Sequence, residues 1–91
     1  DLEKALAYFF RAAALRIELN DKRGHAKTLT NIAAVYEQQK KYQLATETYE
    51  KALKLSKEVN YLKGASKVLS GLAEISYKTG DYKDALARTF R

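Results

Sequence analysis

The 91-residue sequence has no cysteine, proline, methionine or tryptophan, and it has a single histidine. Without cysteine there is neither a disulfide framework nor a thiolate metal site, and nothing indicates an oxidising compartment, so we expect a cytoplasmic protein. One histidine among scattered carboxylates is too few for a zinc site. No apolar run approaches the roughly 20 residues that span a bilayer, and no signal-peptide pattern opens the sequence. We therefore expect no metal, no cofactor and no membrane insertion.

Catalytic motifs are missing as well. A Ser–His–Asp arrangement would have to use His25, beside a turn, and no glycine-framed nucleophile accompanies it. The segment GASKVLSG, residues 64–71, lacks the lysine and glycine spacing of a phosphate-binding loop. Glu47 and Glu50 are three residues apart on an expected helix, where an exposed charged face explains them. We predict that the chain is not an enzyme, and we interpret His25 as an exposed residue in the first turn of a helix.

Positive charge exceeds negative charge, with 17 lysines and arginines against 11 acidic residues and a formal net charge of +6. This balance permits an acidic protein partner or a nucleic acid. The basic residues are scattered, however, and the pairs Lys22–Arg23 and Lys40–Lys41 fall in expected turns. Solvated helix faces explain the charge better. Nucleic-acid binding, with tyrosines as stacking platforms, is kept as an alternative.

Apolar residues recur at helical spacing along almost the whole chain. Leu29, Ile32, Ala33 and Tyr36 follow the i, i+3, i+4, i+7 pattern. No segment shows sustained strand-like alternation, and no Asn-Gly or Asp-Gly hairpin signal is present. We therefore predict an all-α chain whose short turns fold neighbouring helices antiparallel, with Gly80 ending the fourth helix in a left-handed conformation. The expected helices span residues 2–19, 23–39, 42–59, 62–79 and 82–91.

The sequence repeats itself with a period of forty residues. A shift of forty places Gly24 on Gly64, and we expect both glycines in the turns between units. Three alanines fall in register with each other: Ala5, Ala45 and Ala85. One helical hairpin per period is the signature of a solenoid, in which each hairpin packs on its neighbours. Small residues let two helices approach closely while rings fill the space beside them, so we predict that Ala33, Ala45 and Ala52 are buried.

The repeat resembles the tetratricopeptide repeat, whose pattern is W-x₂-L-G-x₂-Y…A-x₃-F…P. The pattern positions in the central unit are taken by Leu29, Ile32, Ala33, Tyr36, Ala45, Tyr49 and Ala52. The next unit matches at Leu69, Leu72, Ala73 and Ala85. Ser76 replaces the expected aromatic residue, the closing proline is absent, and the period exceeds the usual one of about 34 residues. Extended units of this kind are similar to those of Pins-type polarity adaptors and of repeat arrays in bacterial signalling proteins.

The resemblance implies a right-handed α-solenoid of about five helices. Residues 1–20 are then the second helix of a preceding repeat, residues 21–60 a full repeat and residues 61–91 an incomplete one. We therefore expect part of a longer array, or an array that shields its ends by self-association. The implied function is a protein- or peptide-binding module, acting as a sensory, regulatory or scaffolding part of a larger signalling protein. A structural oligomerisation segment is a further alternative.

Members of this family bind peptides in a groove lined by the first helix of each unit. The resemblance implies that the groove residues here are Lys27, Thr30, Ala34, Glu37, Gln38, Lys67, Ser70, Glu74, Tyr77 and Lys78. Lys27 and Lys67 would offer cations to a partner's carboxylates, and Tyr77 would be the main anchor. Thr30 and Ala34 differ from the lysine and asparagine of the clamp that binds chaperone C-termini, so such ligands are not expected. The alternative is that the ten residues are only the polar side of amphipathic helices.

Overall fold

The computed structural model describes residues 1–80, and this part of the chain consists of four helices of 17 residues each. The helices are α1 (Leu2–Glu18), α2 (Lys22–Gln38), α3 (Tyr42–Glu58) and α4 (Leu62–Lys78), and no strand occurs within this range. Each of the eight predicted boundaries lies within one residue of the observed one. The predicted helix over residues 82–91 lies outside the described residues.

The second residue after each helix has a left-handed backbone. These residues and their φ angles are Asn20 (55°), Lys40 (62°), Asn60 (53°) and Gly80 (77°). The predicted left-handed stop at Gly80 is confirmed. After α1, the N–H of Asn20 donates to the carbonyl of Ile17 at 3.0 Å, and the N–H of Asp21 donates to that of Arg16 at 2.8 Å. Such paired bonds satisfy carbonyl groups that the helix itself leaves unpaired, and they turn the chain sharply.

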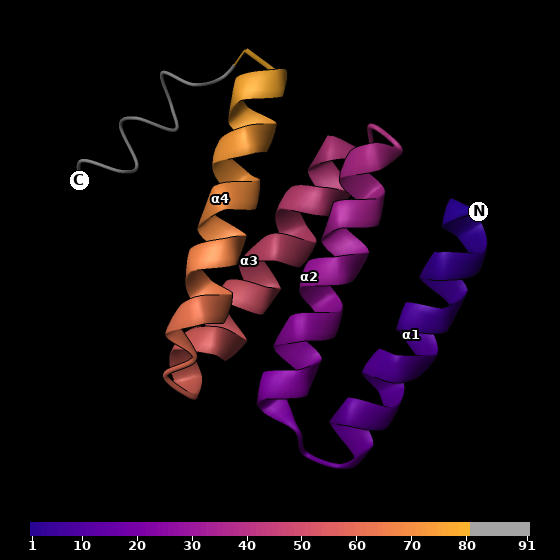
Figure 1. Ribbon diagram of the computed structural model, residues 1–91, viewed down its shortest axis with the longest axis vertical. Coiled ribbons are helices and arrows are strands. Elements are labelled where there is room, and N and C mark those ends of the chain that lie inside the picture. The colour runs from indigo at the N-terminus through magenta and orange to yellow at the C-terminus, as the bar shows by residue number, and fades with distance from the viewer. Residues whose placement is uncertain (81–91) are drawn as a thin grey trace.

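The short linkers make successive helices antiparallel, and the resulting hairpins stack side by side (Figure 1). Helix α2 packs against α1, α3 and α4, whereas α1 and α3 do not pack against each other. Helices α2 and α4 therefore run in the same direction as neighbours, one from each repeat unit. The predicted all-α stack of helical hairpins is confirmed, and the right-handed superhelix stays a prediction.

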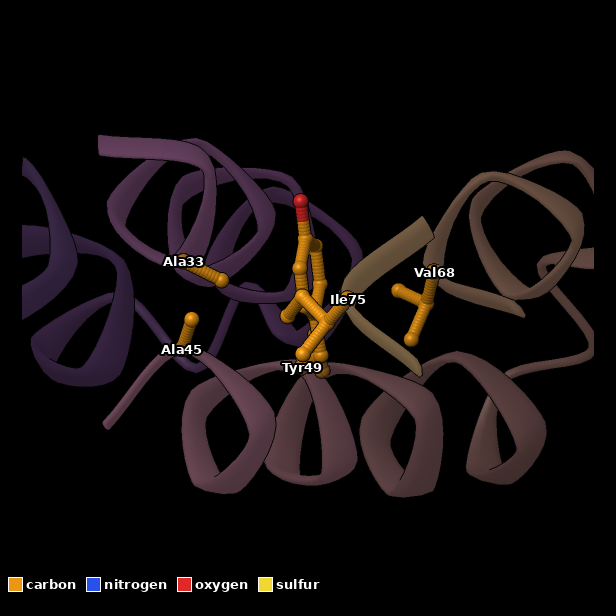
Figure 2. Close-up of a cluster of buried hydrophobic side chains, with 6 residues drawn as sticks. Ala33, Ala45, Tyr49, Val68 and Ile75 are labelled. Carbon is orange, nitrogen blue, oxygen red and sulfur yellow. The ribbon is translucent and has the colours of Figure 1, made fainter. Parts of the chain in front are cut away.

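Three alanines and one aromatic ring form the centre of the core. Ala33, Ala45 and Ala52 are each 0% exposed, which confirms the prediction that these small residues are buried. Figure 2 shows the Tyr49 ring rising from α3, with Ala33 and Ala45 to one side and Ile75 of α4 beside it. Because a methyl group is the whole side chain of alanine, α2 and α3 approach closely, and the ring fills the remaining space.

The Tyr49 ring packs directly on the backbone of α4. A Cβ added at Gly71 would lie 2.5 Å from Cζ and 2.8 Å from the hydroxyl oxygen of Tyr49. A glycine inside a helix costs about 1 kcal/mol relative to alanine, because its backbone loses more freedom on folding. Here that cost is offset by the ring contact, which joins α3 to α4.

The prediction that Gly24 and Gly64 lie in the turns between units is wrong. Each glycine is the third residue of a helix. The N–H of Gly24 donates to Oδ1 of Asp21 at 2.9 Å, and a Cβ at Gly24 would collide with that carboxylate. This hydrogen bond, aided by the Arg16 guanidinium, holds the pKa of the Asp21 carboxyl below its usual range. At Gly64 a Cβ would collide with the ring of Tyr61. Glycine is needed at both positions because the side chain that precedes the helix folds back over its first turn.

Candidate functional site

The ten predicted groove residues lie on α2 and α4, five on each helix. Because the two helices are parallel neighbours, Lys27 and Lys67 line one cavity at the N-terminal end of the pair. At the C-terminal end, Lys78 of α4 meets Glu37 of α2. We call the surface made by the ten residues the α2–α4 face.

Two of the ten side chains are buried and form the floor of this face. The Thr30 hydroxyl donates to the carbonyl of Ala26 at 2.8 Å, so its proton is already engaged. Glu37 is buried as well, whereas Ser70 and Tyr77, the residues forty positions after Thr30 and Glu37, are exposed. The exposed residues of this face are Lys27, Gln38, Lys67, Ser70, Glu74, Tyr77 and Lys78, and Ala34 is half-buried.

The buried carboxylate of Glu37 joins three helices at the C-terminal end of the face. Its Oε2 accepts a hydrogen bond from Nζ of Lys78 at 2.8 Å, and its Oε1 accepts one from the Tyr49 hydroxyl at 3.2 Å. Oε1 of Glu74 lies 3.4 Å from the same Nζ of Lys78. Charge-assisted hydrogen bonds of this kind are stronger than neutral ones, so the network fixes α4 relative to α2 and α3.

The Glu37 network also shifts two pKa values. Its hydrogen bond to Lys78 raises the pKa of that ammonium group, and the charges of Glu37 and Glu74 add to the effect. Burial, followed by the negative charge of Glu37, raises the pKa of Tyr49 to about 12. Both shifts favour the protonated forms that make the network.

A cavity of about 160 Å³ lies at the N-terminal end of the α2–α4 face. Its lining residues are Lys27, Thr30, Asn31, Tyr61, Gly64 and Lys67. The sequence pattern identified three of them, Lys27, Thr30 and Lys67, and missed the other three. Asn31 lies one residue beyond the stripe that the repeat pattern assigns to the groove, and Tyr61 belongs to the linker before α4.

Two positively charged side chains lie over the ring of Tyr61. The guanidinium carbon of Arg23 lies 4.3 Å from the ring centroid, and Nζ of Lys27 lies 5.8 Å from it. Both distances are within the range of cation–π attraction. A sequence signal did exist, because Tyr61 replaces the helix-capping Asp21 of the preceding unit, forty residues earlier. An aromatic residue at a capping position has a packing role to fill, here against cations of α2.

A second cavity of about 400 Å³ opens on a different surface, between α1 and α3, with α2 as its floor. Its walls are mostly apolar: Phe10, Ala13, Ala14, Ile17, Leu29, Ile32, Tyr36 and Leu44, with Glu47, Thr48, Lys51 and His25 at the edges. His25 is half-buried there, and it was wrongly predicted to be exposed. The position of α1 over the first turn of α2 explains this burial, which lowers the pKa of His25.

The described helices carry neither a cluster of metal ligands nor a membrane span. Within residues 1–80, no group of three or more histidine, aspartate and glutamate side chains could hold a metal ion. None of the four helices there is both long enough and apolar enough to cross a membrane.

Stacked helical hairpins with a shared face on parallel helices define the class of α-helical repeat proteins. Residues 1–58 match the tetratricopeptide repeat, and the chain belongs to this family. Its fold is similar to that of designed protein DA05, a solution NMR structure from the Northeast Structural Genomics Consortium, with a TM-score of 0.81 and 23% sequence identity. That match covers 88% of this chain and 81% of the designed one. None of the curated proteins matches the chain. Tetratricopeptide repeats are generally protein-interaction modules and are typically non-catalytic.

Proposed function

We propose that this chain holds a peptide or a protein segment along the α2–α4 face. The observation that carries the proposal is the side-by-side arrangement of α2 and α4, which gives the groove residues of two successive units one common surface. In this proposal the module is a sensory, regulatory or scaffolding part of a larger signalling protein. Occupancy of the face then changes how attached domains are arranged.

Tyr77 is the proposed anchor for the partner. Its side chain is 75% exposed, and it directly precedes Lys78, which pairs with Glu37, in α4. Tyrosine contributes a large contact area with few rotatable bonds, which is why it is enriched among residues that dominate binding energy. The buried floor of Glu37 and Thr30 supports binding because it limits the ordering that the face undergoes when a partner binds.

The test is affinity capture with the full-length protein, followed by calorimetric titration of the captured partner against two variants. Tyr77→Ala should weaken binding at least about tenfold, the effect of losing a central aromatic anchor. Tyr8→Ala is the matched control, because Tyr8 is 68% exposed on α1 and lies outside the α2–α4 face. Unchanged binding by Tyr77→Ala, or equal losses in both variants, would contradict the proposal.

Nucleic-acid binding is the second candidate, and the gathering of Arg23, Lys27 and Lys67 around Tyr61 favours it. The two candidates differ in their response to salt. Affinity for a single-stranded oligonucleotide should fall steeply as salt rises, because phosphate contacts release counterions. A peptide anchored by Tyr77 should respond weakly. A steep salt dependence with no effect of Tyr77→Ala would favour nucleic acid over peptide.

A further inference from the structure

We infer that the 400 Å³ cavity between α1 and α3 belongs to a groove that binds an amphipathic helix of a protein partner, with an aromatic side chain of that helix seated on Leu29. We call this surface the α1–α3 groove. None of the ten residues of the α2–α4 face lines it. The inference therefore goes beyond the proposed function and does not depend on it.

The groove has the length and the periodicity that suit a helix. The 400 Å³ cavity shares Ile17 and His25 with a further cavity of about 290 Å³, so the two adjoin. Together they follow α2 from Lys22 to Tyr36, and a helix rises about 21 Å over that many residues. The α1 wall consists of residues at helical spacing, namely Phe10, Ala13, Ala14 and Ile17. A helix bound in such a groove contributes apolar side chains at i, i+3, i+4 and i+7.

The α1 wall is apolar at positions where the repeat fold does not require it. Phe10 and Ile17 are 50% and 61% exposed, and Ala14 is exposed as well. Forty residues later, α3 has charged residues at the same three positions, which are Glu50, Lys54 and Lys57. Because α3 packs in its hairpin with charged residues there, the fold does not explain the apolar residues of α1. Exposed apolar side chains that gather around a cavity indicate a contact surface.

The floor of the groove has room for an aromatic ring. Leu29 lines the cavity, and it takes the position that is tryptophan in the tetratricopeptide pattern. Since leucine is the smaller side chain, part of the volume that tryptophan would fill is left to the cavity. Ile32 and Tyr36 complete an apolar floor on which a ring can pack. A tryptophan of the partner helix would supply the large side chain that the pattern places there.

The α3 wall adds two charges that a partner helix can meet. Glu47 and Lys51 lie one turn apart on this wall, and neither takes part in an ion pair within residues 1–80. Helices α1 and α3 run in the same direction, and a partner helix of opposite direction places the positive end of its dipole beside their negative ends. Its flank then carries a glutamate opposite Lys51 and, four residues later, a lysine opposite Glu47. This order is also the favourable one within a helix.

The experiment follows the backbone amide NMR shifts of the isotope-labelled full chain. The probe is an end-capped, alanine-based helical peptide of about four turns. It has a stripe of leucines with a central tryptophan, and a glutamate–lysine pair four residues apart on each flank. One comparator has the same composition in scrambled order, and the other has alanine in place of tryptophan. We expect saturable shifts with the probe, centred on Ala14, Leu29 and Thr48, and at least about tenfold weaker binding of both comparators.

Variants of the two walls and the floor locate the binding site. Ile17→Lys introduces the residue that α3 has at this position and should weaken the probe at least about tenfold. Leu15→Lys is the matched control, because Leu15 is 52% exposed on the same helix and lines neither cavity. Glu47→Ala should weaken the probe about threefold, the effect of losing an exposed ion pair.

Leu29→Trp fills the floor with the residue of the family pattern. It should abolish binding of the probe without lowering the free energy of unfolding. If Leu29→Trp does not fold, the comparison of Ile17→Lys with Leu15→Lys decides alone. Tyr77→Ala should leave the probe unaffected, because Tyr77 lies outside the groove.

The inference is overturned by shifts that do not saturate or that centre elsewhere. Equal binding of either comparator peptide, equal losses in Ile17→Lys and Leu15→Lys, or no loss in Glu47→Ala would overturn it as well. Tighter, competing binding of dodecanoate would assign the groove to a small apolar molecule instead. Shifts at the same residues that depend on the concentration of the chain alone would assign it to a second copy. A loss with Tyr77→Ala equal to that with Ile17→Lys would place the peptide on the α2–α4 face.

Discussion

Gly71 of α4 lies against the phenol ring of Tyr49 of α3, and there is no room for a Cβ between them. Alanine at an exposed helix position would be more stable than glycine by about 1 kcal/mol. At position 71 the added methyl group must displace the ring that joins α3 to α4. We therefore predict that Gly71→Ala lowers the free energy of unfolding by about 2 kcal/mol, the usual effect of overpacking a core. Urea unfolding measures it, and an increase in stability would contradict the contact.

The same contact predicts coupling between the two positions. Tyr49→Leu removes the ring atoms that lie against Gly71, so the methyl group of Gly71→Ala should fit in that background. The destabilisation by Gly71→Ala should then fall by at least about 1 kcal/mol relative to the wild type. Strict additivity of the two changes in unfolding free energy would show that the residues do not touch.

Glu37 should stabilise the stack far more than an exposed acidic residue does. Glu37→Ala leaves the Tyr49 hydroxyl and the Lys78 ammonium without their common acceptor, and we expect a loss of about 2 kcal/mol. Glu37→Gln keeps an oxygen acceptor and should lose less. Glu50→Ala is the control, since Glu50 is exposed on α3 and should change stability by less than about 0.5 kcal/mol. Similar effects of Glu37→Ala and Glu50→Ala in thermal unfolding would refute the network.

Stability should decline in alkaline solution because of Tyr49. Its pKa is raised from 10.0 to about 12 in the folded chain, so the folded state holds the phenol proton more tightly than the unfolded state does. The resulting stabilisation is complete below pH 10.0 and is lost as pH rises through about 12. The raised pKa of Lys78 acts in the same direction above 10.5. Tyr49→Phe should therefore lose less stability over this range, as measured by urea midpoints; a parallel loss in both proteins would contradict the assignment.

Lys40 is a site at which the chain can be made more stable. It has φ of 62°, a left-handed conformation that is unfavourable for lysine and accessible to glycine. Lys40→Gly should raise the free energy of unfolding by about 1 kcal/mol. Lys54→Gly, inside α3, should lower it by a similar amount, because glycine there only adds freedom to the unfolded chain. Destabilisation by both changes would contradict the assigned linker conformation.

The helix boundaries were predictable because the linkers carry recognisable residues. Asn20, Asn60 and Gly80 tolerate a left-handed backbone, and they mark three of the four helix ends. Lys40 gives no such signal. The end of α2 was predicted from the break in the helical pattern of apolar residues around Lys40. The buried alanines were predictable for a related reason, since small residues at fixed spacing beside rings indicate that two helices approach closely there.

The candidate site was less predictable because the repeat pattern does not say which positions a neighbouring helix covers. Glu37 and Tyr77 occupy the same position in successive units, yet Glu37 is buried and Tyr77 is exposed. Within residues 1–80, α2 is packed by three helices and α4 by two, so equivalent positions have different surroundings. The replacement of a capping Asp by Tyr61 indicates a packing role, but the sequence does not identify the partner. Arg23 is far away in the sequence, and only the stacking of hairpins brings the two residues together.

The most direct test of a binding role for the α2–α4 face is to map where the captured partner's segment binds, from backbone amide NMR shifts of this chain. We predict perturbations on α2 and α4, centred on Lys67, Ser70 and Tyr77, with little change on α1. Perturbations centred instead on Phe10, Leu44 and Thr48, which line the cavity between α1 and α3, would contradict that role.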